Sequence, residues 1–312
     1  MRILIGYDGS PAAKAALEEL RNAGLPEKAE AYVLSVYPPI LPLESLAPDG
    51  NVPSGYALAY RDAVANQKAA LARSLADAQS AARKVRARFP GWKISSGASV
   101  DVPAHAILDK AESWKADLIV LGSRGWSEFG KLLLGSVADK VLNHASCPVR
   151  LSRPREGARR GPPSLLLAYD GSRHAQAMLA EVSRRAWPKG TRATLLAVSE
   201  FQLRMGDLSI AVSEALGYGR GKGPWPEMER KLMKAAGNLA AAGVEAKTAI
   251  MIGEPRRSLL DQAAKLKVDA IYMGSHGHTG LRRLMLGSVS AAVAAHAPCS
   301  VEVIHMPKAK RK

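Results

Sequence analysis

Two glycine-spaced segments of the chain carry the residue types that bind phosphate groups. Residues 122–136 read GSRGWSEFGKLLLGS and residues 274–288 read GSHGHTGLRRLMLGS, so both fit G-x-x-G, nine residues, then G-S. Each follows a short apolar run and precedes a stretch with helical spacing. A strand, a glycine-spaced loop and a helix start together aim backbone N–H groups at an anion. The pattern predicts two nucleotide-sized sites, or two relics of one.

The residues of the first segment suggest how such a site would work. Gly122 and Gly125 are expected to let the backbone turn tightly and approach a ligand, and Gly135 to do the same where the next helix begins. Ser136 could cap that helix and donate its hydroxyl to a phosphate oxygen, while the N–H groups around Ser136 and Val137 favour an anion. The second segment repeats the arrangement with Gly274, Gly277, Gly287 and Ser288. The alternative is a glycine-bearing turn that serves packing alone.

Charged side chains near the two segments could complete the sites. Asp8 and Asp170 follow short apolar runs, and each carboxylate could hydrogen-bond an adenine, hold Mg²⁺ through water, or form an Asx turn that caps the next helix. Several cations could neutralise phosphates or simply be solvated, namely Arg124, His276, His278, Arg282 and Arg283. The sequence has no Cys/His cluster with metal-ligand spacing, no G-x-x-x-x-G-K-[ST] loop and no recognisable Ser–His–acid set. It therefore supports binding of a nucleotide and gives no support for chemistry on it.

An internal repeat covers most of the chain. ILIGYDGS at 3–10 corresponds to LLLAYDGS at 165–172, and the two glycine segments correspond at an offset of 152. A period near 150 residues is the size of a whole domain rather than of a solenoid repeat. Pro, Gly and Arg dominate the joint between the copies. We expect a first domain at 1–152, a linker at 153–163, a second domain at 164–306 and a basic tail at 307–312.

Within each domain, strand and helix patterns alternate. In the first domain, strands are expected at 2–6, 31–36, 93–100, 117–121 and 148–152, and helices from Pro11, at 57–88, at 103–114 and at 136–144. The Pro-rich stretch 38–55 and its counterpart 217–226 are expected to be loops. Alternating strands and helices predict an α/β fold with a doubly wound parallel sheet in each domain. Such sheets bind ligands beyond the carboxyl ends of their strands, so Asp8 and Gly122 are expected to face one crevice.

Composition describes an ordinary soluble globular protein, with 47% apolar and 23% charged residues. No apolar run approaches the ~18 residues of a spanning helix, and the start of the chain does not resemble a signal peptide. Cys147 and Cys299 occupy equivalent positions and are expected to be small buried residues rather than a disulfide, which favours a cytoplasmic location. The net charge of +16 would suit nucleic acid or an anionic surface. Without a nucleic-acid motif, and with 5% aromatics, a solvated basic surface is the better interpretation.

The motifs together resemble the universal stress protein family in its tandem two-domain form. They are Asp-Gly-Ser at 8–10 and at 170–172, Gly-Glu-Pro at 253–255 and both long glycine segments. The resemblance implies an adenine nucleotide α-hydrolase-like fold, with two tandem doubly wound five-stranded parallel-sheet domains of strand order 3-2-1-4-5. It implies pairing of domains through their fifth strands, within one chain or in a homodimer. It also implies binding of ATP, with or without Mg²⁺, by a cytoplasmic stress-response regulator that turns nucleotide over little or not at all.

The resemblance also implies which residues line the sites. The first would be lined by Asp8, Val36, Gly122, Gly125, Gly135, Ser136 and Val137, and the second by Asp170, Val198, Gly274, Gly277, Gly287, Ser288 and Val289. Asp and Val would serve the adenosine, and the glycines, serines and N–H groups the ribose and phosphates. Asp101 replaces the glycine of Gly-x-Pro in the first copy, where a carboxylate is expected to disturb the loop, and the insertion at 38–55 could fold over the crevice. A slow Mg-dependent ATPase and a nucleotide-free interaction scaffold remain open as alternatives.

Overall fold

The computed structural model describes residues 1–40, 54–123, 134–153, 161–199, 225–277 and 286–306. They fall into two compact units, each described here by itself. Unit 1 holds the first repeat, and unit 2 holds the chain from Arg153 onward together with the short segment Glu19–Pro26. Some predictions fall on residues outside the described ones, namely 41–53 and 217–224 of the two predicted loops, 154–160 of the linker and the tail 307–312.

Unit 1 is built on a parallel sheet of strand order β3-β2-β1-β4-β5. Its elements in chain order are β1 (Arg2–Gly6), α1 (Pro11–Glu19), β2 (Glu30–Tyr37), α3 (Ser54–Arg88), β3 (Lys93–Val100), α4 (Pro103–Ser113), β4 (Leu118–Gly122), α5 (Ser136–His144) and β5 (Val149–Ser152). The short helix η1 (Leu20–Asn22), which follows α1 in the chain, is assigned to unit 2. The apolar runs of β1 and β4 form the core, since Ile3 to Ile5 and Leu118 to Val120 are fully buried. Strands covered on both faces need such continuous apolar runs.

Unit 2 repeats this architecture, with the order β8-β7-β6-β9-β10. Its elements are β6 (Ser164–Ala168), α6 (Arg173–Ser183), β7 (Arg192–Ser199), α8 (Trp225–Ala241), β8 (Glu245–Ile252), α9 (Pro255–Leu266), β9 (Ala270–Gly274), α10 (Ser288–His296) and β10 (Ser300–Ile304). Numbered within its own repeat, each sheet has the order 3-2-1-4-5. The doubly wound five-stranded fold implied by the sequence is confirmed in both repeats.

The predicted elements match the observed ones closely. The strands at 2–6 and 93–100 and the helix at 136–144 have the predicted bounds, and the other elements differ by one to three residues at their ends. The largest difference is at α3, which begins at Ser54 instead of residue 57. In the second repeat, α8 begins at Trp225, so the last two residues of the predicted loop 217–226 are helical. Pro226 does not prevent this, because proline is tolerated in the first turn of a helix.

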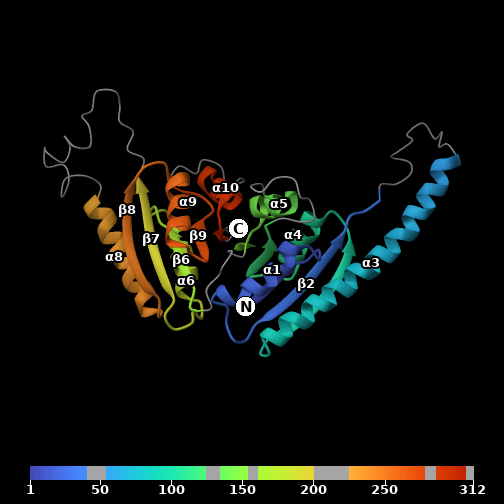
Figure 1. Cartoon of the computed structure of the whole chain (residues 1–312), viewed down its shortest axis with the longest axis horizontal. Helices are drawn as coiled ribbons and strands as arrows, with labels where there is room; N and C mark the ends of the chain where they lie inside the picture. Colours follow the sequence, from blue (N-terminus) through green and yellow to red (C-terminus); the bar gives the residue numbers. More distant parts are fainter. Residues whose placement is uncertain (41–53, 124–133, 154–160, 200–224, 278–285, 307–312) are drawn as a thin grey trace, which may run out of the picture. The chain divides into compact units, whose positions relative to one another are not determined.

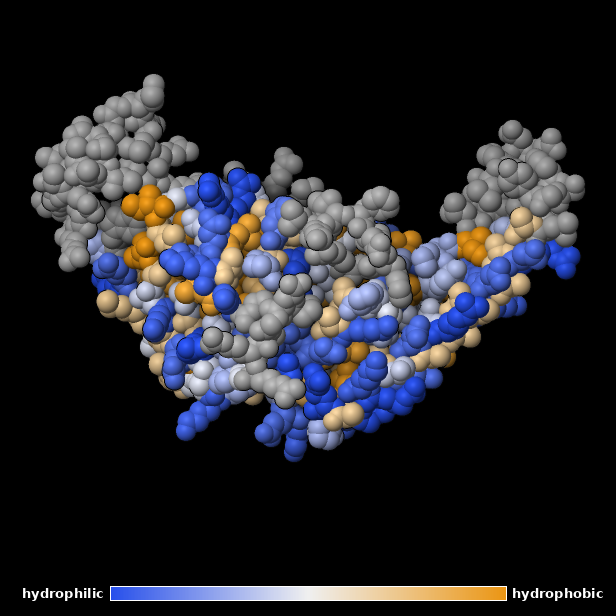
Figure 2. All heavy atoms as spheres, in the orientation of Figure 1, coloured by the Kyte–Doolittle hydropathy of each residue, from blue (hydrophilic) through white to orange (hydrophobic). Residues whose placement is uncertain are grey.

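Only the later part of α3 packs on the sheet. The helix contacts β2 and β3, and its fully buried residues are Ala78, Ala81, Ala82 and Val85. Its earlier turns reach past the ends of these strands (Figure 1), and no side chain from Ala59 to Asp77 is buried. Hydrophilic side chains run along the helix on the face shown in Figure 2. None of the described helices combines the length and apolarity needed to cross a membrane.

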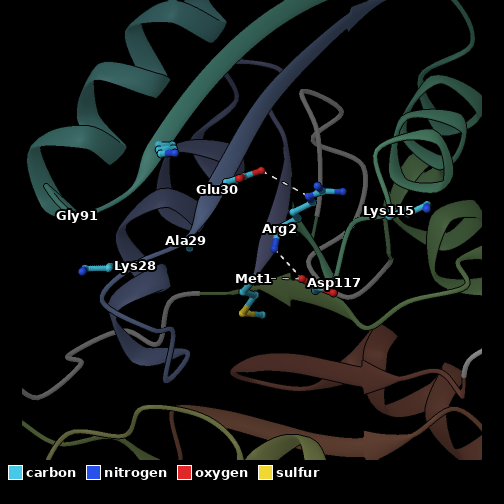
Figure 3. Close-up of a pocket in the computed structure, with 9 residues that line it drawn as sticks. Met1, Arg2, Lys28, Ala29, Glu30, Gly91, Lys115 and Asp117 are labelled. Atoms are coloured by element: carbon cyan, nitrogen blue, oxygen red, sulfur yellow. Dashed lines mark hydrogen bonds and ion pairs between the residues drawn. The ribbon is translucent and has the colours of Figure 1, made fainter.

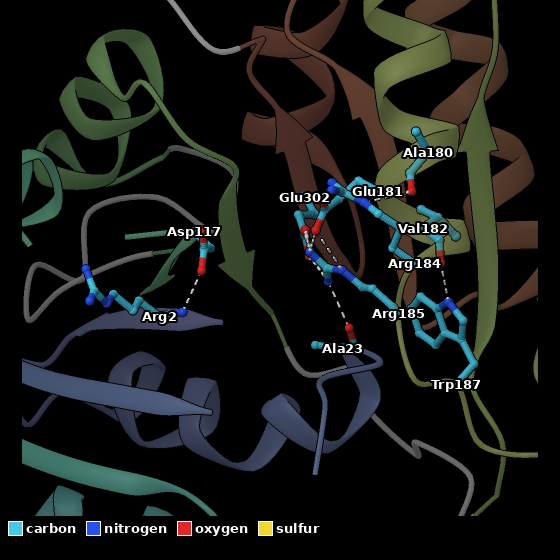
Figure 4. Close-up of polar contacts among 10 residues, drawn as sticks. All are labelled: Arg2, Ala23, Asp117, Ala180, Glu181, Val182, Arg184, Arg185, Trp187 and Glu302. Atoms are coloured by element: carbon cyan, nitrogen blue, oxygen red, sulfur yellow. Dashed lines mark hydrogen bonds and ion pairs between the residues drawn. The ribbon is translucent and has the colours of Figure 1, made fainter. Parts of the chain in front are cut away.

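A buried ion pair ties α6 to β10 within unit 2. Arg185, just after α6, donates to both carboxylate oxygens of Glu302, one contact being 3.0 Å. It also donates to the carbonyl oxygen of Ala23 at 2.8 Å (Figure 4). The Glu302 side chain is fully buried, and that of Arg185 is 3% exposed. Burial opposes ionisation of Arg185, but the Glu302 carboxylate outweighs it and raises the pKa of the guanidinium. Arg185 therefore stays charged in the interior.

Candidate functional site

The carboxyl edge of unit 2 holds a cavity of about 490 Å³. It lies where β6 and β9 are parallel neighbours and the winding of the sheet reverses, the position at which doubly wound sheets bind ligands. All seven residues predicted for the second site line it, namely Asp170, Val198, Gly274, Gly277, Gly287, Ser288 and Val289. The structure thus brings together residues that lie far apart in the sequence.

The walls of the cavity include apolar residues that the motifs did not reveal. Leu196 comes from β7, Met273 from β9, and Pro255 and Leu259 from α9. Pro255 is the proline of the Gly-Glu-Pro motif, which was not assigned to the site, and the other three belong to no recognisable motif. An apolar wall with a few polar groups at fixed positions is the usual form of a small-molecule site, and this cavity is within the usual size range.

The helix that starts at the cavity has no side-chain cap. Its N-cap residue is Gly287, and no side chain among the described residues accepts a hydrogen bond from its first turn. Two other helices of unit 2 are capped, α6 by the hydroxyl of Ser172 and α9 by the carboxylate of Glu254. The first-turn N–H groups of α10 therefore lack the partner that helix ends normally have, and with the helix dipole they favour an anion.

The predicted capping role of the two serines is wrong. Ser136 and Ser288 are the first helical residues of α5 and α10, and Gly135 and Gly287 occupy the N-cap positions. A side chain at the first helical position points away from the N–H groups that a capping oxygen accepts from, because capping requires the extended backbone of the preceding residue. The serine hydroxyls therefore play no part in capping and are left to interact with other groups.

Two of the predicted ligand-approach glycines serve packing. A Cβ on Gly274 would lie 2.6 Å from Cβ and 2.8 Å from the carbonyl carbon of His174. A Cβ on Gly122 would lie 2.7 Å from the carbonyl carbon of Ala12. Both are glycine because the first turn of α1 or α6 packs directly on the strand end, so packing requires a glycine at these positions, and Gly274 lines the cavity as well. Gly277 lies on the cavity side of the loop, and a Cβ placed on it would meet only Oδ2 of Asp170, at 2.8 Å.

Asp8 and Asp170 form the Asx turns considered from the sequence. Oδ1 of Asp170 accepts the N–H of Ser172 at 2.9 Å, and Oδ1 of Asp8 accepts the N–H of Ser10 at 3.0 Å. The glycine between each pair has a positive φ, 75° at Gly9, which favours glycine. Asp170 also lines the cavity, so the capping turn and a ligand-facing position coexist there.

The first repeat places its predicted residues in the same way. Asp8 follows β1, Val36 lies near the end of β2, and Gly122 ends β4, the parallel neighbour of β1. At α5, Gly135 is again an N-cap without a side-chain bond, followed by Ser136 and Val137. Asp101 accepts the N–H of Val102 at 2.6 Å, whereas the equivalent Gly253 has φ of 154°. Five predicted site residues lie outside the described residues: Arg124, Gly125, His278, Arg282 and Arg283.

Burial shifts the pKa of one ionisable group at the cavity of unit 2. Tyr169 lines the cavity, and burial raises the pKa of its hydroxyl. His276 also lines the cavity, and its Nε2 atom is buried without a hydrogen-bond partner among the described residues. The sequence had already indicated His276 as one of the cations near the site, at the position equivalent to Arg124. The described part of the chain contains no group of three His, Cys, Asp or Glu side chains placed to hold a metal ion.

A larger depression, of about 550 Å³, lies at the opposite edge of the unit 1 sheet (Figure 3). Two of its contacts hold neighbouring strands and their ends together: Arg2 Nε lies 3.4 Å from Glu30 Oε2, and Asp117 Oδ2 accepts the backbone N–H of Arg2 at 2.7 Å. Unit 2 repeats the latter contact between Ser164 and Asp269, at 2.8 Å. A contact shared by both repeats at the amino edge supports a structural role, so this depression is not the candidate site.

Comparison with known proteins places the chain among relatives of one kind. The family model described as the universal stress protein family matches residues 1–153 and again 163–305. A universal stress protein of Methanocaldococcus jannaschii is 43% identical over 75 residues, which cover 23% of this chain and 44% of the relative. One from Mycolicibacterium smegmatis is 28% identical over 211 residues, covering 64% of this chain and 65% of the relative. The matches thus span about half to two thirds of these relatives' length.

A solved structure has the same fold over nearly the whole length. The crystal structure of a universal stress protein from Archaeoglobus fulgidus superimposes with a TM-score of 0.63 at 23% identity, covering 97% of this chain and 98% of that one. At this identity the likeness supports the fold alone. Two successive matches to one family model, on two units of one architecture, show that the chain is a tandem two-domain member of the universal stress protein family.

Proposed function

We propose that the chain is an adenine-nucleotide-binding regulatory protein, with ATP as the ligand of the unit 2 cavity and little or no turnover of it. The observation that carries the proposal is the uncapped start of α10 at a cavity lined by all seven predicted residues. Phosphate groups suit N–H groups that have no other acceptor, and the helix dipole adds to the attraction. The same arrangement at α5 extends the proposal to unit 1.

The residues present fit a nucleotide from end to end. Val198, Leu196 and Met273 offer apolar contacts to a base, and Asp170 offers a carboxylate to its hydrogen-bonding edge. Gly277 and Gly287 leave the loop and helix start without side chains, so that a phosphate can approach the backbone. The unpartnered Nε2 atom of His276 supplies a further polar group. Bound ATP would supply a polyanionic end to this edge, with or without Mg²⁺.

Low turnover follows from the ionisable groups at the cavity. Among the described lining residues these are Tyr169, Asp170 and His276. Oδ1 of Asp170 already accepts the N–H of Ser172, and the Tyr169 hydroxyl has a raised pKa, so it stays protonated at neutral pH. A slow ATPase remains the second candidate, because His276 lies at the cavity and could accept a proton.

The cytoplasm is the compartment we propose for this function. Cys147 and Cys299 form no disulfide among the described residues; Cys299 is buried as expected, whereas Cys147 is half-buried. Burial raises the pKa of the Cys147 thiol to about 12, so it is a poor nucleophile at neutral pH. Thiols of this kind suit a reducing compartment, and they support a packing role for both residues.

Calorimetry with a matched variant tests the nucleotide proposal. Gly287→Val places a branched side chain at the N-cap, where its Cβ alone would lie 3.1 Å from the Ser275 carbonyl oxygen. We expect this variant to bind ATP at unit 2 about tenfold or more weakly. The control is Gly237→Ala on α8, where a Cβ meets nothing within 4 Å. Mass spectrometry of small molecules retained by the native protein should identify an adenine nucleotide. If no nucleotide is retained and no binding heat is measured, an interaction scaffold is the remaining function.

Phosphate release distinguishes the regulator from the slow ATPase. The binding protein should release no phosphate above background with Mg²⁺ and ATP. Release that disappears in the double variant Gly135→Val with Gly287→Val would show that the protein is an enzyme. Release that persists in that variant would come from a contaminant.

A further inference from the structure

Three histidines meet at the carboxyl edge of unit 2. His174 lies in the first turn of α6, where its backbone packs against Gly274. His276 lies two residues beyond β9, and its ring centroid is 5.2 Å from that of His174. His305 directly follows β10, and the preceding carbonyl, of Ile304, accepts the N–H of Ser275 at 3.0 Å. Three separate segments thus bring their imidazoles to one corner of the sheet, which we call the histidine cluster.

Two nitrogen atoms of the histidine cluster have unmet hydrogen-bonding capacity. Nε2 of His276 and Nε2 of His305 are buried, and neither has a hydrogen-bond partner among the described residues. Nδ1 of His276 lies 3.1 Å from the hydroxyl of Ser275. A buried polar atom without a partner costs free energy, so a ligand atom or a proton that engages it is favoured. Because His276 lines the cavity, the cluster can respond to what the cavity holds.

Burial favours the neutral form of two members of the cluster, His174 and His305. Burial, followed by the influence of His276, lowers the pKa of His174, and Asp170 acts in the opposite direction. Burial, followed by His276 and His174, lowers the pKa of His305 to about 4. Of the neighbouring elements, α6 adds the exposed Arg173, and α10 has no charged residue and a single ionisable one, at its far end. Asp170 is therefore the described anion that acts on the cluster.

The histidine cluster belongs to the second repeat alone. Ala12, Arg124 and Arg153 stand at the positions equivalent to His174, His276 and His305. The first repeat has permanent cations at two of the three positions, where the second has groups that gain or lose a proton. Equivalent sites in one chain thus differ in whether their charge depends on pH.

We propose that the histidine cluster is a proton-linked anion sensor, in which the anionic end of a ligand in the unit 2 cavity draws about one proton onto the imidazoles. The proposal rests on the proposed function and adds its regulation. A phosphate beside His276 favours the charged imidazole, as any neighbouring anion does. Since binding favours protonation, protonation favours binding by the same factor. Affinity for the nucleotide should therefore rise as pH falls, and unit 2 should bind ATP more tightly in an acidified cell.

Proton uptake is measured by calorimetry of the full chain in several buffers. ATP is titrated at pH 7.5 into the protein in buffers of different ionisation enthalpy, and the slope of the observed heat against that enthalpy counts protons. We expect uptake approaching about one proton with ATP and none with adenosine, which has no phosphate. Uptake of one proton corresponds to a tenfold change in affinity per pH unit, so we also expect the dissociation constant at unit 2 to fall by up to about thirtyfold between pH 8 and pH 6.5, with a correction for protonation of ATP itself.

Substitutions taken from the first repeat make the test specific. His276→Arg fixes a positive charge at the cavity, and it should bind ATP without proton uptake and with an affinity independent of pH. His174→Ala introduces the residue of the first repeat and should reduce the proton count. His296→Gln, at the exposed end of α10, is the control and should keep the count of the unmodified protein. Each variant is checked for an unchanged circular dichroism spectrum.

The outcomes separate the sensor from the nucleotide site itself. ATP binding with the same heat in every buffer would refute the sensor and leave the nucleotide proposal standing. A proton count that persists in His276→Arg would also refute it, because a fixed positive charge at this position disfavours protonation of the two remaining imidazoles. The absence of any ATP heat, together with no retained nucleotide, would overturn the nucleotide proposal and the sensor with it.

Discussion

Gly274 and Gly277 lie three residues apart in one loop, and the structure predicts opposite consequences for the same substitution. In Gly274→Ala the new methyl group would lie 2.6 Å from Cβ and 2.8 Å from the carbonyl carbon of His174. These atoms belong to the first turn of α6, so relief requires a shift of the whole helix end. Overpacking of this kind typically costs about 1–3 kcal/mol. We expect the free energy of unfolding of unit 2 to fall by that amount.

In Gly277→Ala the new methyl group meets something that can move. Its one close contact is Oδ2 of Asp170, at 2.8 Å, the end of a side chain that can rotate. Gly277 is exposed and its φ is not positive, so we expect the free energy of unfolding to change by less than about 0.5 kcal/mol. The displaced carboxylate is a cavity residue, and ATP affinity should fall instead.

Stability and affinity are measured on the same two variants. Hydrogen exchange of α6 and β9 reports the stability of unit 2 separately from the rest of the chain, and urea unfolding gives the free-energy change. Calorimetry gives the affinity for ATP. Gly237→Ala serves as the control for adding a methyl group without a contact. If Gly277→Ala destabilises unit 2 as much as Gly274→Ala, or if Gly274→Ala is neutral, then our separation of a packing glycine from a ligand-facing glycine is incorrect.

Three further predictions concern the stability of unit 2. Glu302→Ala leaves the buried Arg185 guanidinium without its main counter-ion and should cost about 3–5 kcal/mol in urea unfolding; the double replacement Arg185→Met with Glu302→Leu should recover much of this loss, and a double variant as unstable as the single one would contradict the ion-pair interpretation. Ser172→Ala removes the hydroxyl that caps α6 and should cost about 1 kcal/mol, whereas Ser288→Ala, which removes no cap, should cost clearly less; equal losses would argue against the assigned N-caps. The pKa of His305 is lowered to about 4 in the folded state, so the unfolded chain binds the proton first and stability should fall by roughly 3 kcal/mol as pH drops from 6.5 to 4; the pH profile of the thermal midpoint should flatten in His305→Gln and would be unaltered if this histidine did not contribute.

Much of the fold could be read from the sequence because its signals are local. Ser10 and Pro11 begin a helix through an N-cap hydroxyl and a pre-set φ, and the structure shows the Ser10 hydroxyl accepting the N–H of Ala13 at 3.1 Å. The buried strands are short apolar runs because both faces of a parallel sheet are covered. Where the prediction was less accurate, as at the start of α3, the helix continues beyond the sheet that stabilises its later turns.

The roles within the candidate site were harder to predict, because they depend on which atoms approach. Gly274 and Gly277 belong to the same motif, yet Gly274 contacts α6 whereas Gly277 faces Asp170. The serine at each helix start has the right type for a cap but lies one residue too late. Spacing in a sequence fixes the distance along the chain, and it does not fix which side of a glycine faces a helix and which faces a cavity.

The sequence by itself determined the repeat, the alternation of strands and helices and the resemblance to the family, and this resemblance implied seven of the residues that line the second cavity. The repeat and the alternation follow from the spacing of residues along the chain, and both copies show this spacing. Only the tertiary structure decided that His174, His276 and His305 come together, because they follow three different strands and no motif links them. The carboxyl ends of parallel strands lie at one edge of the sheet, and for this reason the three histidines that follow these strands lie close together.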